Sequence, residues 1–164
     1  MDQQSIRQKL EQWLVNFVEK PNPLLNNWPP CPYARQARIA NRIQIVFDSP
    51  LEIATYVPVL DDHDVVVLCF DPVEYTASQV ELFTQHINSI LIHKDYVVLE
   101  DHPDSKEFVN GVQMNFEECG LMILQRLSKL NTAADQLREK GYYTTWSNEN
   151  LDQVVNWRYA LRKN

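Results

Sequence analysis

The chain of 164 residues is poor in glycine and cysteine. Its three glycines stand too far apart for a glycine-rich phosphate loop or a dinucleotide-binding fingerprint. Its three cysteines, Cys31, Cys69 and Cys119, form no CxxC pair and are too few for a disulfide framework. These absences exclude the common nucleotide-binding loops and indicate reduced thiols.

Long apolar runs and an excess of basic residues are also missing. No segment approaches the roughly 18 continuous apolar residues of a membrane span, and the net charge of −7 opposes a general nucleic-acid or anionic-membrane surface. The first residues lack the basic and apolar regions of a secretory signal. We therefore expect a soluble, cytoplasmic protein with neither nucleic acid nor membrane as a partner.

The length of the chain and the positions of its helix- and strand-breaking residues predict one domain, residues 1–164. Five prolines lie at 21–32, after the first amphipathic pattern, and a helix of about ten residues begins at the last of them. The predicted parts are an N-terminal helix at 1–20, a proline-rich arm at 21–32, an α+β core at 42–146 and a C-terminal helix at 147–164.

Two continuous apolar runs, VVVLCF at 65–70 and LMILQ at 121–125, are typical of central strands. DYVVLE at 95–100 and YYTTW at 142–146 predict outer strands. One helical pattern lies between 65–70 and 95–100, and another lies between 121–125 and 142–146. Strand, helix, strand, strand, helix, strand is the split βαβ order of ferredoxin-like folds. We therefore predict an α+β fold with a four- or five-stranded mixed sheet, which RIQIVF at 42–47 extends, and added terminal helices.

The stretch WPPCPYARQARIANR is the least ordinary part of the chain, because prolines and a cysteine precede a helix with three arginines. Pro32 suits the first turn of a helix, so Cys31 would be the N-cap. The positive end of the helix dipole would stabilise a thiolate there and lower the pKa of Cys31. Cys31 is therefore the predicted nucleophile, although cysteine is also among the residues most often packed in a core.

Three arginines follow Cys31 at steps of four, three and four residues: Arg35, Arg38 and Arg42. On a helix this spacing places them on the same face as the thiol. They would clamp an anionic small molecule, with Trp28 as a further binding residue. The alternative is that each arginine pairs with an acidic residue of the same chain.

The segment CPYARQARIA resembles the CPYA-type active-site turn of glutaredoxins and some glutathione transferases. TYVPVL, with Pro58, is similar to the Val-Pro segment that precedes a strand in those families. The resemblance implies that Cys31 is an active-site thiol. It covers about twenty residues, and the strand that leads into the cysteine in those families is replaced here by the proline-rich arm.

Two acidic clusters, DDHD at 61–64 and DHPD at 101–104, contain carboxylates and imidazoles that suit zinc or iron. The predicted topology places them at opposite ends of the sheet, so a shared metal site would need another fold. We predict neither metal nor cofactor. Asp101 and His102 are candidate catalytic residues, with His102 as a general base, because a long connection begins at this point.

Two functions remain open. The first is a ferredoxin-like binding or assembly module with a possible anion site. The second is a thiol-dependent enzyme or redox protein that acts on an anionic small molecule through Cys31. Exposed sheet edges and the apolar stripe of the N-terminal helix favour a homodimer in either case.

Overall fold

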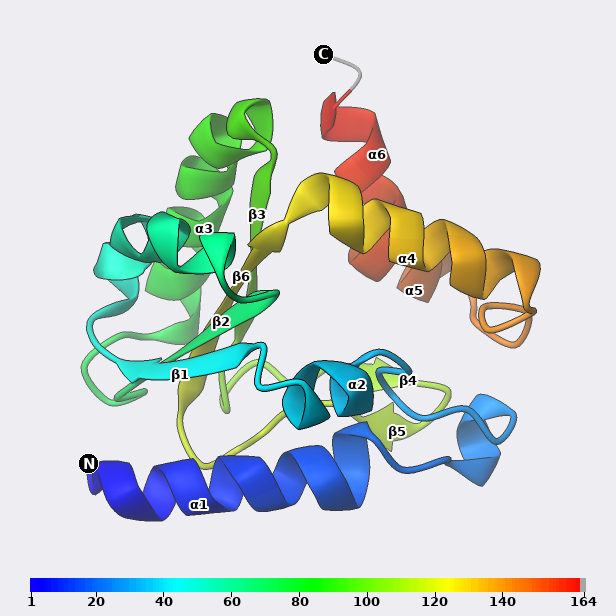
Figure 1. Ribbon diagram of the computed structural model, residues 1–164, viewed down its shortest axis with the longest axis horizontal. Helices are drawn as coiled ribbons and strands as arrows, with labels where there is room; N and C mark the ends of the chain where they lie inside the picture. The colour runs from blue at the N-terminus through cyan, green and yellow to red at the C-terminus, as the bar shows by residue number, and fades with distance from the viewer. Residues whose placement is uncertain (163–164) are drawn as a thin grey trace.

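The computed structural model describes residues 1–162 and shows an α+β fold (Figure 1). Helices surround a four-stranded mixed sheet, and a two-stranded hairpin lies apart from it. The last two residues of the expected C-terminal helix, 163–164, are outside the described part of the chain. None of the helices in residues 1–162 has the length and apolar character that crossing a membrane requires.

The bounds of the elements follow the chain from end to end. The strands are β1 (Ile43–Phe47), β2 (Val65–Phe70), β3 (Tyr96–Asp101), β4 (Phe108–Val109), β5 (Val112–Gln113) and β6 (Gly120–Arg126). The α-helices are α1 (Gln3–Trp13), α2 (Ala34–Ile39), α3 (Ala77–Leu91), α4 (Leu127–Glu139), α5 (Asn148–Leu151) and α6 (Trp157–Arg162). Tighter or wider helical turns are η1 (Leu14–Val18), η2 (Pro23–Leu25), η3 (Pro50–Asp61), η4 (Ile92–Lys94) and η5 (Asp152–Asn156).

The sheet has the order β1-β2-β6-β3. β1 is parallel to β2, and β6 is antiparallel to both β2 and β3. The two apolar runs therefore occupy the centre as expected, and β1 extends the sheet. The prediction of a fourth strand at 142–146 is wrong, because the aromatic rings of that segment pack on one another in a series of turns. The ferredoxin-like topology is not confirmed.

One face of the sheet is covered by α3 and η3, which lie together beside the strands in Figure 1. Alternate residues of the central strands supply this core, among them Phe70 and Met122. The Phe70 ring lies directly over Gly120, where an added Cβ would come within 2.1 Å of the ring. Only glycine therefore fits the start of β6.

The other face is covered in two parts. Ile6 and Leu10 of α1 pack on β1, β2 and β6 at one end. Leu127 of α4 and Trp157 of α6 pack with Val97 of β3 at the other end. In Figure 1 these two layers lie at the bottom and the top of the molecule, with α2 and the hairpin between them.

Both edges of the sheet are blocked by side chains. Arg7 Nη2 donates to the carbonyl oxygen of Ile45 in β1 at 3.3 Å, and its guanidinium lies over the Phe47 ring. On the opposite edge, the Asn88 amide bonds both the N–H and the carbonyl of Val98, at 2.8 and 2.9 Å. These contacts occupy part of each edge, and the homodimer stays a prediction.

Candidate functional site

The proline-rich arm is a closed loop rather than the extended segment expected. Asn22 N–H donates to the Trp28 carbonyl at 3.0 Å, and Asn26 and Asn27 adopt left-handed backbone angles that reverse the chain. Leu25 is buried against the β4–β5 hairpin. The arm is therefore a packed part of the fold, and it presents residues 28–33 to the C-terminal half of the chain.

Residues 28–33 meet the segment after α4, and we call this contact the arm junction: residues 28–33, Gln136 and residues 142–146. The Tyr142 hydroxyl donates to the Pro30 carbonyl at 2.6 Å. The Tyr33 hydroxyl donates to Gln136 Oε1 at 2.9 Å. The Trp28 ring stands edge-on to Tyr142 with ring centroids 5.6 Å apart. Trp28, a predicted binding residue, thus contributes to packing at this contact.

Gly141 explains why residues 142–146 can reach the arm. Its left-handed backbone, with φ +85°, ends α4, as is typical of a glycine that follows a helix, and Tyr142 N–H then donates to the Leu137 carbonyl at 2.9 Å. Beyond the turn, Tyr142, Tyr143 and Trp146 form mutual ring contacts. The result is an aromatic cluster beside Cys31.

The setting of Cys31 differs from the expected helix N-cap. Helix α2 begins at Ala34 with Tyr33 as its N-cap residue, so Cys31 lies in the turn before the helix. Cys31 is exposed as a residue, but protein atoms crowd its sulfur, and this desolvation raises the pKa of the thiol. Backbone N–H groups of Tyr33 and Ala34 oppose the rise, and the charge of Glu19 adds to it. The expected depression of the Cys31 pKa is therefore wrong.

The three arginines do not form the expected stripe, because two of them pair with acidic residues of the same chain. Arg38 binds Glu19 through two hydrogen bonds of 2.6 and 2.9 Å, and the Glu19 side chain is only 5% exposed. Arg42 lies beyond the end of α2 and pairs with Asp64 at 2.9 Å. Arg35 is exposed and makes no hydrogen bond or ion pair with a described residue. The three side chains thus form no common clamp.

His102 and Asp101 belong to a different region. The imidazole is buried, with 3% exposed; Nε2 lies 2.7 Å from the Tyr75 carbonyl, and Nδ1 accepts the Asp104 N–H at 3.1 Å. These bonds place the proton on Nε2 and occupy both ring nitrogens. Asp101 accepts hydrogen bonds from Asn115 Nδ2 and the Phe116 N–H. Among the described residues, no hydrogen bond or ion pair joins either residue to Cys31, so the proposed nucleophile and base are not brought together.

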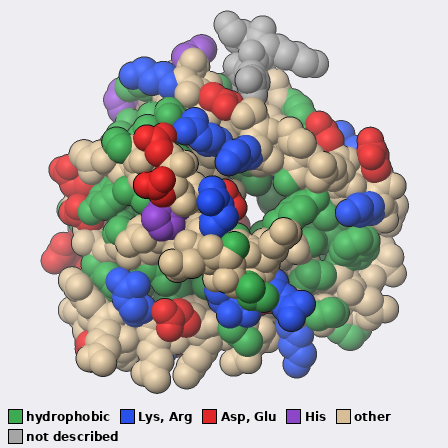
Figure 2. Space-filling model, in the orientation of Figure 1, with side chains coloured by type: hydrophobic (Ala, Val, Ile, Leu, Met, Phe, Trp, Pro, Cys, Tyr) green, Lys and Arg blue, Asp and Glu red, His purple; other side chains and the backbone are tan. Residues whose placement is uncertain are grey.

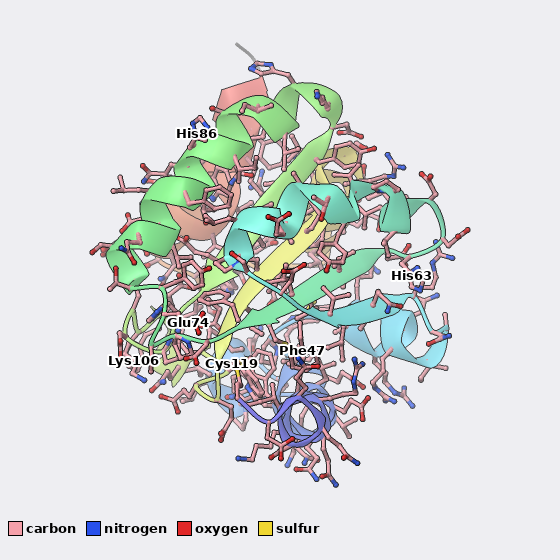
Figure 3. The ribbon with its side chains drawn as sticks, turned by 90° about the vertical axis from the view of Figure 1, so that its left-hand side faces the viewer. Phe47, His63, Glu74, His86, Lys106 and Cys119 are labelled. Carbon is pink, nitrogen blue, oxygen red and sulfur yellow. The ribbon has the colours of Figure 1, made fainter. Side chains whose placement is uncertain are left out.

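The acidic clusters lie apart as predicted. DDHD precedes β2 and DHPD follows β3, and these two strands run in the same direction. Figure 3 shows His63 at one end of the strands and Lys106, just after the second cluster, near the other end. Within residues 1–162, no group of three or more His, Cys, Asp or Glu side chains is arranged to hold a metal ion.

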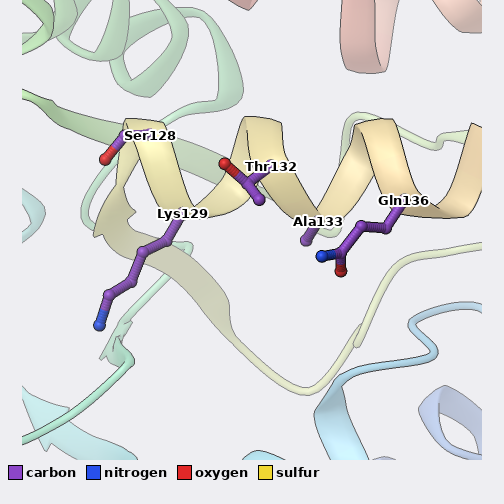
Figure 4. A pocket seen from close by; sticks show the side chains of 5 residues that line it. All are labelled: Ser128, Lys129, Thr132, Ala133 and Gln136. Carbon is purple, nitrogen blue, oxygen red and sulfur yellow. The ribbon is translucent and has the colours of Figure 1, made fainter.

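A shallow hollow of about 260 Å³ lies along α4, next to the arm junction. Five residues line it: Ser128, Lys129, Thr132, Ala133 and Gln136. Figure 4 shows the Lys129 and Gln136 side chains pointing from α4 toward the segments below it, and Figure 2 shows that this face is hollowed near its centre. The bond between Tyr33 and Gln136 connects the hollow to the arm.

Arg158 of α6 is a buried charged residue that the sequence analysis did not select. Its side chain is buried, with 3% exposed, and Nε donates to the Val155 carbonyl at 3.3 Å. Tyr143 of the arm junction is its electrostatic neighbour. No carboxylate of a described residue lies within ion-pair distance. Desolvation lowers the pKa of Arg158.

Comparison of the chain with protein-family models, with curated proteins and with solved structures finds no match. The function must therefore be argued from the arm junction itself.

Proposed function

We propose that this protein is a small binding module and that its ligand lies at the arm junction, beside the hollow along α4. The observation that carries the proposal is the state of Cys31. Desolvation holds its thiol pKa above the ordinary value, so the sulfur is a neutral donor at pH 7 rather than a nucleophile.

The surroundings of the thiol also favour binding. Tyr142, Tyr143 and Trp146 offer aromatic surface beside Cys31, and the hollow adds polar side chains. Aromatic walls with a few directed polar groups are typical of small-molecule sites. The imidazole of His102, the residue chosen as a base, is occupied by the Tyr75 carbonyl and Asp104.

A thiol-dependent enzyme remains the second candidate. Backbone N–H groups of Tyr33 and Ala34 are directed at the Cys31 sulfur, and such donors stabilise a thiolate. The resemblance of CPYA to a glutaredoxin-type turn agrees with this alternative.

We retain the ferredoxin-like arrangement as a proposal for β2, α3, β3 and β6 only. A cytoplasmic location and a homodimer remain predictions.

Cysteine alkylation as a function of pH tests the proposal. Iodoacetamide labelling, followed by mass spectrometry of each cysteine peptide, should modify exposed Cys31 before the buried Cys69 and Cys119. The Cys31 rate should still rise above pH 9, because only the thiolate reacts. A Cys31 rate that is already maximal at pH 7 would contradict the binding module and support the enzyme.

A further inference from the structure

We infer that the arm junction binds a small oxyanion, a carboxylate or a phosphate group, through the Tyr143 hydroxyl, with Arg158 and Arg138 supplying the positive charge. This inference rests on the proposed binding function and names its ligand class. The site differs from the clamp that the sequence suggested, which lay on α2 at Arg35, Arg38 and Arg42.

The first argument is the burial of Arg158 without an anion. A guanidinium group stays charged in proteins, and a buried charge is strongly unfavourable unless it is paired. Arg158 has a backbone carbonyl and a tyrosine hydroxyl as neighbours, but it has no ion pair within residues 1–162. A bound anion would supply the missing charge.

The second argument is the direction of the Tyr143 hydroxyl. A guanidinium can only donate, so the Tyr143 oxygen can act toward the neighbouring Arg158 only as an acceptor. The hydroxyl proton is then free to donate to a ligand. Burial raises the pKa of Tyr143, so the residue stays a neutral phenol and does not neutralise Arg158. Tyr143 is partly exposed, which gives a ligand access to its hydroxyl.

The third argument is the local excess of positive charge in a protein of net charge −7. Arg138, in the last turn of α4, is exposed and makes no ion pair or hydrogen bond through its side chain to the described residues. Its charge, like that of Arg158, acts on Tyr143. Two acidic groups of this region have other partners: Asp135, whose charge also acts on Arg158, accepts the Tyr159 hydroxyl at 2.7 Å, and Glu19 is paired with Arg38.

Thermal melting of the full chain tests the inference. Sodium phosphate should raise the melting temperature of the wild type above that in sodium chloride of equal ionic strength, because the anion binds only the folded state. A parallel series in sodium acetate separates recognition of a phosphate group from that of a carboxylate. Fitting the melting temperatures against anion concentration gives a dissociation constant for each variant.

Arg158→Met should abolish the anion response, and without anion it should melt at the same temperature as the wild type or higher, since it removes an unpaired buried charge. Tyr143→Phe should weaken binding about tenfold by removing one hydrogen bond to a charged group. Arg138→Gln should also weaken it. Arg35→Gln, which removes an exposed unpaired arginine from α2, is the matched control and should respond like the wild type.

An anion response that is equal in the wild type, Arg158→Met and Tyr143→Phe would overturn the inference, as would a response lost only in Arg35→Gln. If Arg158→Met does not fold, Arg158 is structural in a way that the inference denies, and Tyr143→Phe then decides whether an anion binds there. The Cys31 alkylation profile is independent of all these results. A high Cys31 pKa without an anion response would retain the binding module and reject its anionic ligand.

Discussion

The connection at residues 102–119 and the region of the arm junction differ in how their buried polar groups are paired. In the connection, Asn115 is 7% exposed and makes four hydrogen bonds, to Asp101, His102, Ser105 and Glu107. Beside the arm junction, Arg158 of α6 is also buried, without any ion pair among the described residues.

The difference separates a structural role from a binding role. Buried polar groups are normally hydrogen-bonded within the protein, and one that is incompletely paired needs a further explanation. Asp101 and His102, chosen from the sequence as catalytic, have partners that hold the connection in place. Arg158, beside the arm junction, has no ion pair with a described residue. Four substitutions can break or sharpen this contrast.

The largest effect is expected for Asn115→Ala. The substitution removes four hydrogen bonds and leaves their buried partners unpaired, so the free energy of unfolding should fall by about 3 kcal/mol. Asn16→Ala, at an exposed position of η1, is the control and should change it by less than about 0.5 kcal/mol. Urea denaturation measures both. Similar values for the two variants would show that the connection is not held by Asn115.

Tyr142→Phe should have the second largest effect. It removes the buried hydroxyl that donates to the Pro30 carbonyl and should cost about 1 kcal/mol of unfolding free energy. Tyr33→Phe removes the exposed bond to Gln136 and should cost less. If the Tyr33 substitution is the more damaging one in urea denaturation, the arm is attached to α4 rather than to Tyr142.

Glu19→Gln should change the chemistry of the arm junction more than its stability. The negative charge of Glu19 contributes to the raised pKa of Cys31, so its removal should lower that pKa and speed alkylation at pH 8. Glu11→Gln, an exposed change on α1, should leave the rate unaltered. Equal rates in the wild type and Glu19→Gln would mean that Glu19 does not influence the thiol.

The smallest effect is expected for Glu107→Gln in the connection. Burial, with the charges of Asp101 and Glu100, raises the pKa of Glu107 from 4.5 to about 7. The folded state then favours the protonated acid, so this contribution to stability is complete below pH 4.5 and is lost as the pH rises through 7. Protein atoms surround the carboxylate, but Glu107 as a whole residue is exposed. Solvent therefore screens its charge and keeps the effect on stability small.

The variant should therefore show a weaker fall in unfolding free energy between pH 4.5 and 7 than the wild type. Glu117→Gln is the opposite control, because Lys106 holds the pKa of Glu117 below its usual value and favours the charged form. A steeper fall in Glu107→Gln than in the wild type would contradict the assignment.

The strands were predictable because the pattern of apolar residues is local. The continuous runs at 65–70 and 121–125 could be buried only on both faces of a sheet, and they form its centre. Gly141 identified the end of α4 for a similar reason, since it alone accepts the left-handed angle there. The Asn110-Gly111 turn of the β4–β5 hairpin carried an equally local signal that the analysis overlooked.

The partners of the arginines were not predictable, because they depend on residues far away in the chain. Nothing near Arg38 identifies Glu19 as its partner, and helical spacing wrongly continued the stripe to Arg42 after the helix had ended. Arg158 did leave a trace. It falls three residues after Val155 and four after Val154, so an arginine interrupts the apolar stripe of the C-terminal segment.

The most direct measurement for the whole account is a titration of the 15N-labelled protein with inorganic phosphate, followed through backbone and arginine side-chain NMR signals. We predict saturable shifts at residues 31–34 and 141–146 and at the Arg158 Nε–H, with residues 102–119 unchanged. Shifts confined to α2 and Arg42, or no saturable shift at constant ionic strength, would contradict the claim that the arm junction is the binding site.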